Sequence, residues 1–541
     1  MKGSRTGAHA LLSAAQAAGI RVCFANPGTT ELGLVRALDE VPAIRPVLGL
    51  FEGVCTGAAD GYARVAGVPA LTLLHLGPGL ANGLANLHNA RRANSPVVNI
   101  IGDHATWHLP FDAPLTSDIE GLARPMSRSV IRLNSAGSVE RSLRRAVVES
   151  MSAPRGVVTV IAPSDLMDAP VPESASESVS SSGSRCARRV PAERIAHAAA
   201  RLTAQDGVII LLGGDALTER GQRAAMRIAA AAGARLLMES YPAIVPLGGD
   251  LPPLERLAYF PQDVIAQLGS SMVLLVGARA PVSYFGYAGQ PSELVASGRL
   301  VELSTPEEDG VTALEQLAGQ IAARPDFIAA PGSAPPAHAT TPPAHATTPP
   351  AHATTPLVHS HELTPAGLAQ ELVEQIPQDA IVSLEGSTCG GPYLQRAHGA
   401  RRHWVMTNTG GAIGQGIPCA LGAAIARPDA RVIGLQSDGS AQYTVQALWT
   451  IAREQLNVTV IICANHRYGI LQTELRRAGA ELERPALARM TQLDSPRVDW
   501  VALAGGYGVP GVRATTSSEF RAALATALRA AGPYLIEAQL T

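Results

Sequence analysis

The sequence predicts an α/β protein built from three doubly wound domains, each with a parallel sheet. Short apolar runs alternate with Ala-rich helical stretches along all 541 residues. Apolar runs of about five residues that are joined by helices are typical of parallel strands covered on both faces. The chain is also too long for a single hydrophobic core, and two low-complexity stretches divide it.

The two low-complexity stretches set the domain boundaries. We predict an N-terminal domain at 1–170, a Ser-rich linker at 171–187 and a central α/β domain at 188–332. A linker at 333–358, built on three copies of PAHATTP, precedes a C-terminal domain at 359–541. The repeat contains His338, His345 and His352. Because Pro-rich repeats are extended and solvated, these histidines indicate a linker rather than a metal site.

The composition excludes several classes of protein. Apolar residues make up 46% and charged residues 16% of the chain, and the formal net charge is −2. This balance gives no reason to expect a nucleic-acid partner or an anionic membrane surface. The six cysteines form no Cys-x-x-Cys pair, which is typical of free thiols in a cytoplasmic protein. The N-terminus predicts an amphipathic helix ended by Gly19, and not a signal peptide.

Most of the predicted strands end in Gly, Asp, Asn or His. The expected strands and the turns after them lie at 22–28, 46–53, 69–79, 96–104, 207–215, 234–240, 272–279, 299–304, 380–388, 403–411, 431–440, 458–466 and 534–539. Parallel sheets bind ligands beyond the carboxyl ends of their strands. The sequence therefore concentrates its reactive residue types where a ligand site is expected.

Two oxygen ligands emerge from neighbouring strand ends in the last domain. Asp438 follows one apolar strand, and Asn465 follows the next strand, 27 residues later. A strand, helix and strand of that length return the chain to its starting edge. A hard cation such as Mg²⁺ prefers such oxygen ligands, and a helix starting near Ser440 would favour a diphosphate. The alternative is that Asp438 caps a helix and Asn465 occupies a turn.

This segment resembles the thiamine-diphosphate signature of the acetolactate synthase and benzoylformate decarboxylase superfamily, Gly-Asp-Gly followed by a distant Asn. Ser437 replaces the first Gly, and both side-chain ligands remain. The resemblance implies a magnesium ion held by Asp438, Asn465 and the carbonyl of Arg467. The same resemblance places four further residues near the diphosphate: Gly439, Ser440, Tyr468 and Gly469.

Two loops upstream extend the resemblance. It places Thr388 of GSTCGG at the diphosphate and the carbonyl of Gly410, in TNTGGAIGQGIP, at the aminopyrimidine. It makes Ile413 the apolar wedge between the two cofactor rings, with ordinary core packing as the alternative. The N-terminal domain is then the pyrimidine-binding domain, and the C-terminal domain is the diphosphate-binding domain.

The N-terminal domain supplies a candidate activating carboxylate. Glu52 ends an apolar strand and begins a Gly- and Ala-rich helix, after the motif NPGTTEL and before a GPG loop. Apolar surroundings suit a carboxylate for proton exchange. By the resemblance, Glu52 contacts the aminopyrimidine and drives formation of the ylid. The resemblance also implies a homodimer or a dimer of dimers, with active sites between subunits. A Glu that only stabilises the helix N-terminus is the alternative.

The residues that choose the product are less regular. His75 precedes the GPG loop, where benzoylformate decarboxylases carry a proton-handling His. Thr29 matches a substrate-contacting Ser of those enzymes, and His104 and His108 are further candidates near the cleft. We therefore expect a decarboxylase of a 2-oxo acid that acts through an ylid and an enamine. An acetolactate-synthase-like carboligase and a catalytically silent cofactor-binding paralogue are the alternatives.

Two positions depart from both family patterns. Gly286 stands where the second His of benzoylformate decarboxylase is expected, with Tyr284 and Tyr287 nearby, and Glu474 stands where acetolactate synthases place a Trp. No residue set requires FAD, so we expect none bound. The central domain lacks the Gly-x-Gly-x-x-Gly fingerprint, which argues against a nucleotide-dependent dehydrogenase.

Overall fold

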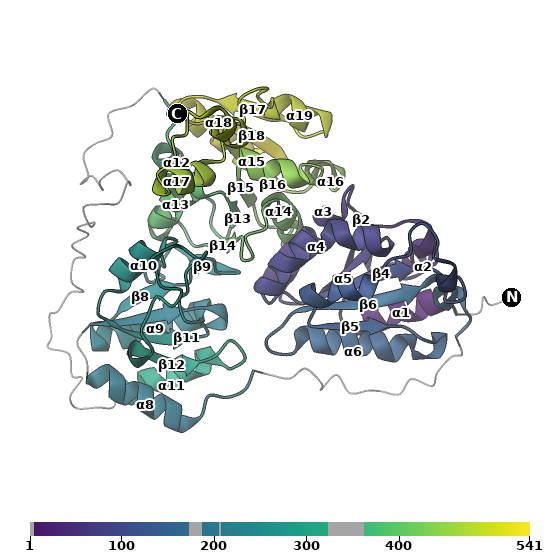
Figure 1. Ribbon diagram of the computed structural model, residues 1–541, viewed down its shortest axis with the longest axis horizontal. Coiled ribbons are helices and arrows are strands. Elements are labelled where there is room, and N and C mark those ends of the chain that lie inside the picture. Colours follow the sequence, from purple (N-terminus) through teal and green to yellow (C-terminus); the bar gives the residue numbers. More distant parts are fainter. Residues whose placement is uncertain (1–4, 172–186, 205–206, 323–361) are drawn as a thin grey trace. The chain divides into compact units, whose positions relative to one another are not determined.

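The computed structural model describes residues 5–171, 187–204, 207–322 and 362–541, which form two compact units (Figure 1). The first unit comprises Met1–Cys186, Glu362–Tyr393 and His403–Thr541. The second comprises Ala187–His361 and Leu394–Arg402. The predicted repeat linker, with His338, His345 and His352, lies outside the described residues, as does most of the Ser-rich linker.

A six-stranded parallel sheet forms the N-terminal part of the first unit, in the order β2-β1-β3-β4-β6-β5. The strands are β1 (Val22–Asn26), β2 (Arg45–Leu48), β3 (Ala70–Leu74), β4 (Val97–Asp103), β5 (Ser129–Arg132) and β6 (Val157–Pro163). The helices are α1 (Gly7–Ala17), α2 (Leu32–Glu40), α3 (Glu52–Ala66), α4 (Leu76–Arg92), α5 (Ile119–Ala123), α6 (Val139–Met151) and α7 (Ser164–Asp168). Strands β5 and β6 add to the four strands that the sequence predicts here.

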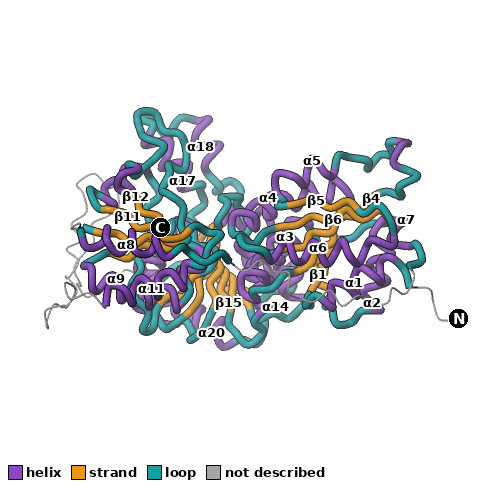
Figure 2. The backbone as a smooth tube through the Cα atoms, turned by 90° about the horizontal axis from the view of Figure 1, so that it is seen from below, coloured by secondary structure: helices purple, strands orange, loops and turns teal. Residues whose placement is uncertain are grey.

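Helices cover both faces of this sheet. Helix α1 packs against α2, α6 and α7, while α4 packs against α3 and α5. Figure 2 shows α4 and α5 on one side of the strands and α1 and α2 on the other. Every residue of β3, β4 and β6 is buried, as expected for strands with no solvent-facing side.

A second parallel sheet forms the C-terminal part of the first unit, with β17-β18-β16-β15-β13-β14 in order. Its strands are β13 (Ile381–Glu385), β14 (His403–Thr407), β15 (Val432–Ser437), β16 (Val458–Ala464), β17 (Gly511–Ala514) and β18 (Tyr534–Gln539). The helices of this part are α12 (Pro365–Gln375), α13 (Ser387–Arg396), α14 (Gly416–Ala426), α15 (Asp438–Ala441), α16 (Ala447–Arg453), α17 (Gly469–Arg477), α18 (Pro485–Thr491), α19 (Trp500–Gly506) and α20 (Ser517–Arg529).

The second unit contains a five-stranded parallel sheet in the order β10-β8-β7-β11-β12. Its strands are β7 (Val208–Leu212), β8 (Arg235–Met238), β10 (Glu255–Arg256), β11 (Met272–Val276) and β12 (Leu300–Ser304), and β9 (Val245–Leu247) lies between β8 and β10 along the chain. Its helices are α8 (Ala192–Thr203), α9 (Glu219–Ala232), α10 (Pro261–Leu268) and α11 (Gly310–Ala322).

Three parallel sheets with helical crossovers confirm the predicted fold class. Among the helices of the described residues, none is both long and apolar enough to cross a membrane.

Helices α3 and α14 join the N-terminal and C-terminal parts of the first unit. Both are buried over most of their length, which suits their small residues. A Cβ atom on Gly61 would lie 2.2 Å from the carbonyl oxygen of Cys419, and one on Gly422 would lie 1.9 Å from that of Ala58. The two backbones therefore approach too closely for any side chain at these positions.

A buried ion pair lies beside this helix contact. Arg64 donates to Asp60 at 2.6 Å and to the carbonyl of Thr407 at 2.8 Å, and Gln415 donates to the same carboxylate at 2.6 Å. Both charged side chains are almost fully buried. Removing one partner would leave the other charge buried and unpaired, which is costly. Because Arg64 also donates to Thr407, the pair attaches α3 to the segment around Thr407.

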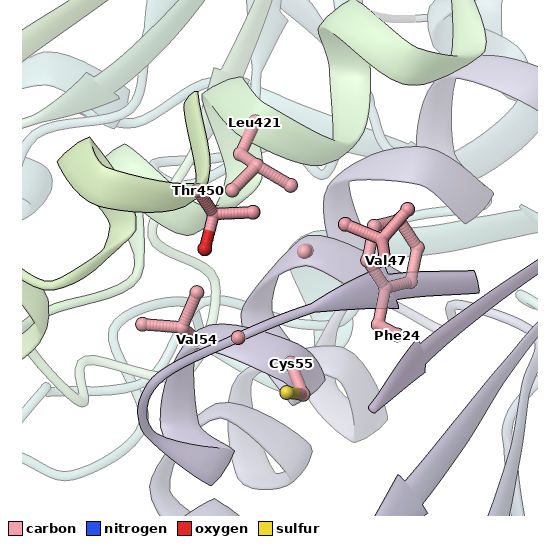
Figure 3. A pocket seen from close by; sticks show the side chains of 8 residues that line it. Phe24, Val47, Val54, Cys55, Leu421 and Thr450 are labelled. Carbon is pink, nitrogen blue, oxygen red and sulfur yellow. The ribbon is translucent and has the colours of Figure 1, made fainter. Parts of the chain in front are cut away.

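A small apolar pocket also lies at this contact (Figure 3), with an empty volume of about 130 Å³. It is lined by Phe24, Val47, Gly49, Val54, Cys55, Ala58, Leu421 and Thr450. Burial raises the pKa of the Cys55 thiol, so the thiol stays protonated at neutral pH. The pocket brings no polar atoms together apart from this thiol and the Thr450 hydroxyl, which donates to the carbonyl of Leu48. It is therefore a packing gap and not a reaction site.

The substitution Gly422→Ala tests the helix contact. We expect it to lower the free energy of unfolding by about 1–3 kcal/mol or more, because the added methyl group overpacks two backbones. Gly505→Ala in α19, where a Cβ meets nothing within 4 Å, is the matched control and should be neutral or stabilising. Urea unfolding followed by far-UV circular dichroism measures both. Equal stability of the two variants would contradict the close approach.

Candidate functional site

The register of two neighbouring strands brings Asp438 and Asn465 to one edge of the C-terminal sheet. Strands β15 and β16 are parallel, with Ser437 opposite Cys463. Asp438 follows β15 directly, one residue beyond that register pair, and Asn465 follows β16 directly, two residues beyond it. The Asn465 amide donates to the Thr388 hydroxyl at 3.2 Å. We call Asp438, Asn465, Thr388, Gly439, Tyr468 and Gly469 the anchor cluster.

The Asp438 carboxylate is 5% exposed, and within the described chain no Lys or Arg pairs with it. The backbone N–H groups of Gly439 and His466 donate to it at 2.9 and 2.7 Å. Burial raises the pKa of Asp438, and these two hydrogen bonds oppose the rise. The nearest basic side chain is the His466 ring, whose Nδ1 lies 3.9 Å from the carboxylate. A buried carboxylate with no Lys or Arg beside it fits a bound cation.

The donor set also fits Mg²⁺ in particular. Among the described residues no group of three His, Cys, Asp or Glu side chains could hold a metal. The set here is one carboxylate, one amide and backbone carbonyls, which leaves room for water and phosphate oxygens. The Arg467 carbonyl accepts the N–H of Gly469 at 3.0 Å, and its second lone pair remains for a ligand.

A glycine allows the close packing of the anchor cluster. A Cβ atom on Gly439 would lie 2.6 Å from the Tyr468 ring, so this position requires a glycine. A Cβ atom on Gly469 would make only an ordinary contact, 3.5 Å from the Asn465 amide nitrogen. The helix that the sequence predicts near Ser440 instead begins at Asp438 and lasts four residues, and the Ser440 hydroxyl donates to the Ser437 carbonyl at 3.1 Å. So short a helix has little macrodipole to offer a diphosphate.

A buried carboxylate that the sequence analysis missed shapes the loop with Gly410 and Ile413. Glu385, the last residue of β13, accepts the N–H groups of Gly414 at 2.8 Å and Gly416 at 2.7 Å. Desolvation raises the pKa of Glu385, and the N–H donors oppose the rise. The sequence did contain a signal for Glu385, because this carboxylate ends an apolar strand and directly precedes a Gly.

The loop keeps Ile413 out of the core. Ile413 is 37% exposed, which argues against ordinary core packing and leaves its side chain accessible to a ligand. The Gly410 carbonyl accepts a hydrogen bond from the His88 ring at 3.1 Å.

A second group of polar side chains lies at the start of α3 and α4. Glu52 is 8% exposed, and the amide of Asn82 donates to its Oε2 at 3.0 Å. A Cβ atom on Gly79 would lie 3.1 Å from Glu52 Oε1 and 3.4 Å from the Cβ of His75. Glu52 and His75 therefore flank one glycine. We call Glu52, His75, Glu31 and Asn82 the proton cluster.

Glu31 holds the His75 ring, a role that the sequence analysis did not assign although it quoted the motif NPGTTEL. Its carboxylate is completely buried, lies 2.7 Å from His75 Nδ1 and accepts the N–H of Gly28 at 2.7 Å. A Cβ atom on Gly102 would lie 1.7 Å from Glu31, so the carboxylate fills the space above that glycine. With Nδ1 engaged, Nε2 is the nitrogen of His75 that is left for a substrate.

The weaker candidates lie around this cluster. Thr29 is exposed, and its neighbour Thr30 is the residue whose hydroxyl contacts His75, at 3.3 Å. His104 follows β4, and its ring meets that of His108 with centroids 5.6 Å apart. Its Nε2 is buried and has no hydrogen-bond partner among the described residues.

The structure does not join all predicted site residues. Within the described chain, no hydrogen bond or ion pair links Glu52 to the anchor cluster. Gly286, Tyr284 and Tyr287 belong to the second unit, whereas Glu474 lies in α17 of the first.

The comparisons with known proteins agree with this geometry. The family model "Thiamine pyrophosphate enzyme, N-terminal TPP binding domain" matches residues 5–122, and the corresponding C-terminal TPP binding domain matches residues 389–538. A Mycobacterium tuberculosis protein named "Putative acetolactate synthase large subunit IlvX" is 43% identical over 98% of each chain.

Benzoylformate decarboxylase of Pseudomonas aeruginosa is 29% identical over 96% of each chain. The solved structure of the thiamine diphosphate-dependent 4-hydroxybenzoylformate decarboxylase of Rhodococcus jostii RHA1 aligns with a TM-score of 0.81 at 26% identity, covering 99% of each chain. The chain therefore belongs to the thiamine pyrophosphate enzyme family that includes acetolactate synthases and benzoylformate decarboxylases.

Proposed function

We propose that this protein decarboxylates a 2-oxo acid with thiamine diphosphate and Mg²⁺, in the manner of a benzoylformate decarboxylase. The observation that carries the proposal is the proton cluster, in which a buried Glu31 orients His75 beside Glu52. An imidazole held at one nitrogen and free at the other is suited to deliver a proton to a reacting carbon. Proton delivery after loss of carbon dioxide yields an aldehyde.

In this proposal the anchor cluster holds the cofactor. Asp438, Asn465 and the Arg467 carbonyl would bind Mg²⁺, and Thr388, with the backbone around Gly439 and Gly469, would bind the diphosphate. Thiamine diphosphate supplies, when bound, the electron sink that a 2-oxo acid needs to lose carbon dioxide. The loop that Glu385 shapes would present Gly410 and Ile413 to the cofactor rings.

Glu52 would exchange a proton with the aminopyrimidine through one oxygen. Asn82 already donates to Oε2, so Oε1 is the oxygen that is left for exchange. Burial keeps bulk water from competing for that proton. His75 would act later and at a different atom, by giving a proton from Nε2 to the product.

A carboligase is the second candidate, because the relative that is 43% identical carries the name of an acetolactate synthase large subunit. The two activities differ in the reaction partner of the carbon that remains after decarboxylation. In a decarboxylase this carbon takes up a proton, and in a carboligase it adds to a second carbonyl compound. A screen of pyruvate, 2-oxobutyrate and benzoylformate, which follows carbon dioxide, aldehyde and hydroxyketone separately, distinguishes them. Hydroxyketone as the main product would overturn the decarboxylase proposal.

We also propose a cytoplasmic homodimer or dimer of dimers whose active sites lie between subunits. The lack of a hydrogen bond or ion pair between Glu52 and the anchor cluster, among the described residues, supports a site that a second copy completes. Mixing inactive Glu52→Gln and Asp438→Asn chains should then restore part of the activity. No restoration in mixed oligomers would contradict shared sites.

The substitution Asp438→Asn tests the metal site. We expect Mg²⁺-dependent binding of thiamine diphosphate to weaken at least about 100-fold, since the only charged ligand is lost. The thermal midpoint of the metal-free protein should stay close to that of the parent, because a desolvated charge is removed. Isothermal titration calorimetry measures the affinity. Asp429→Asn, on the exposed side of a turn, is the control and should bind the cofactor normally.

The substitution Glu52→Gln tests activation. Turnover and hydrogen–deuterium exchange at the thiazolium carbon should both fall about 10²- to 10⁴-fold, because Gln cannot exchange the proton. Cofactor affinity should change only a few-fold. Glu40→Gln, at the exposed end of α2, serves as the control with normal exchange. Rapid exchange in Glu52→Gln, measured by NMR after acid quench, would exclude the proposed role.

Glu31 and His75 should act as one unit. We expect Glu31→Gln to lower kcat/KM about 10- to 100-fold through the misplaced ring. His75→Ala should lower it at least as much, and the double variant should be no worse than His75→Ala alone. Thiazolium exchange should remain normal in all three, which separates them from a folding defect. Additive losses in the double variant would show that the two residues work independently.

A further inference from the structure

The second unit contains a guanidinium, that of Arg256, which pairs with no carboxylate among the described residues. Arg256, the last residue of β10, lies opposite Met238 at the carboxyl edge of the parallel sheet. Its guanidinium lies over the Tyr241 ring, 5.9 Å from the centroid. Within the described part of the chain, no carboxylate or hydrogen-bond acceptor contacts it.

Other arginines of the same unit show the contrast. Arg194, Arg220 and Arg223 each pair with a carboxylate at 2.6–2.9 Å. Arg256 is the more buried case, and burial lowers the pKa of its guanidinium below the usual range. Since a desolvated charge without a partner is costly, a bound anion would stabilise this position.

Further aromatic rings continue from Tyr241, on which the guanidinium lies. The Tyr241 ring contacts Tyr284 with centroids 5.9 Å apart, and Tyr284 contacts Tyr259 and Phe285 at 5.0 Å each. Tyr284 is 42% and Phe285 is 55% exposed, so this aromatic wall reaches the surface. Exposed aromatic faces beside a cation suit a ligand with a flat apolar body and one negative end.

We propose that the second unit binds a small aromatic carboxylate, with its carboxylate on Arg256 and its ring against Tyr241 and Tyr284. A single guanidinium matches one carboxylate in charge and in its two-pronged geometry. The position agrees with the general preference of parallel sheets for ligands at the carboxyl ends of their strands. This site is defined by residues of the second unit alone, and it does not depend on the proposed reaction.

The test uses benzoate as the probe on the full-length protein with thiamine diphosphate and Mg²⁺. Titration calorimetry should detect a benzoate site whose affinity falls about 10- to 100-fold in Arg256→Gln, as expected for one lost charge-assisted contact. Arg223→Gln is the control, because its guanidinium pairs with Asp250 at the surface. Unchanged benzoate affinity in Arg256→Gln would overturn the proposal.

Three further arms keep the result interpretable. Benzoate should still bind to Asp438→Asn protein, so a failure of the cofactor site and a failure of this site can be told apart. Inorganic phosphate should bind at least 10-fold more weakly than benzoate, and equal or tighter phosphate binding would overturn the carboxylate assignment. If Arg256→Gln does not fold, Arg256→Lys replaces it, and a benzoate affinity equal to that of the parent protein would likewise refute the proposal.

Discussion

The parallel register of β13, β15 and β16 is the constraint on which the anchor cluster depends. Parallel pairing sends consecutive strands to the same edge, so Asp438, Asn465 and the helix start near Thr388 arrive together, although Thr388 and Asn465 are 77 residues apart along the chain. A one-residue slip between β15 and β16 would turn alternate side chains to the other face and separate the amide from the hydroxyl. The geometry of the anchor cluster therefore depends on the pairing of buried strands whose own side chains do not belong to the cluster.

Buried carboxylates recur in the first unit, and backbone N–H groups hold three of them. Glu31 accepts the N–H of Gly28, Glu385 accepts those of Gly414 and Gly416, and Asp438 accepts those of Gly439 and His466. Neutral donors stabilise a carboxylate without neutralising its charge, unlike an arginine partner. A carboxylate held in this way can still pair with a cation, an imidazole or the N–H groups of a loop.

The sequence predicted the fold class and thirteen of the strands, because apolar runs and Gly-rich turns are local signals. It missed β5, β6, β9, β10 and β17. It placed Asp438 and Asn465 correctly on adjacent strand ends, since parallel topology leaves little choice. It missed Glu31 and Glu385, whose partners His75, Gly414 and Gly416 lie far along the chain or beyond a loop. It expected one helix starting near Ser440, where the structure has the four-residue α15, a 3-10 helix at Gln442–Thr444 and then α16. Long-range hydrogen bonds and the exact path of a loop leave no periodic pattern of residue types, so a sequence does not reveal them.

The contact between α3 and α14 has a consequence for how the protein can be divided. These two helices come from opposite halves of the chain, and each buries Gly and Ala residues against the other. A fragment cut at the Ser-rich linker would leave α3 with a bare apolar groove in water. The N-terminal and C-terminal parts of the first unit each contain their own sheet, but neither should fold stably without the other. They should therefore be expressed on one chain.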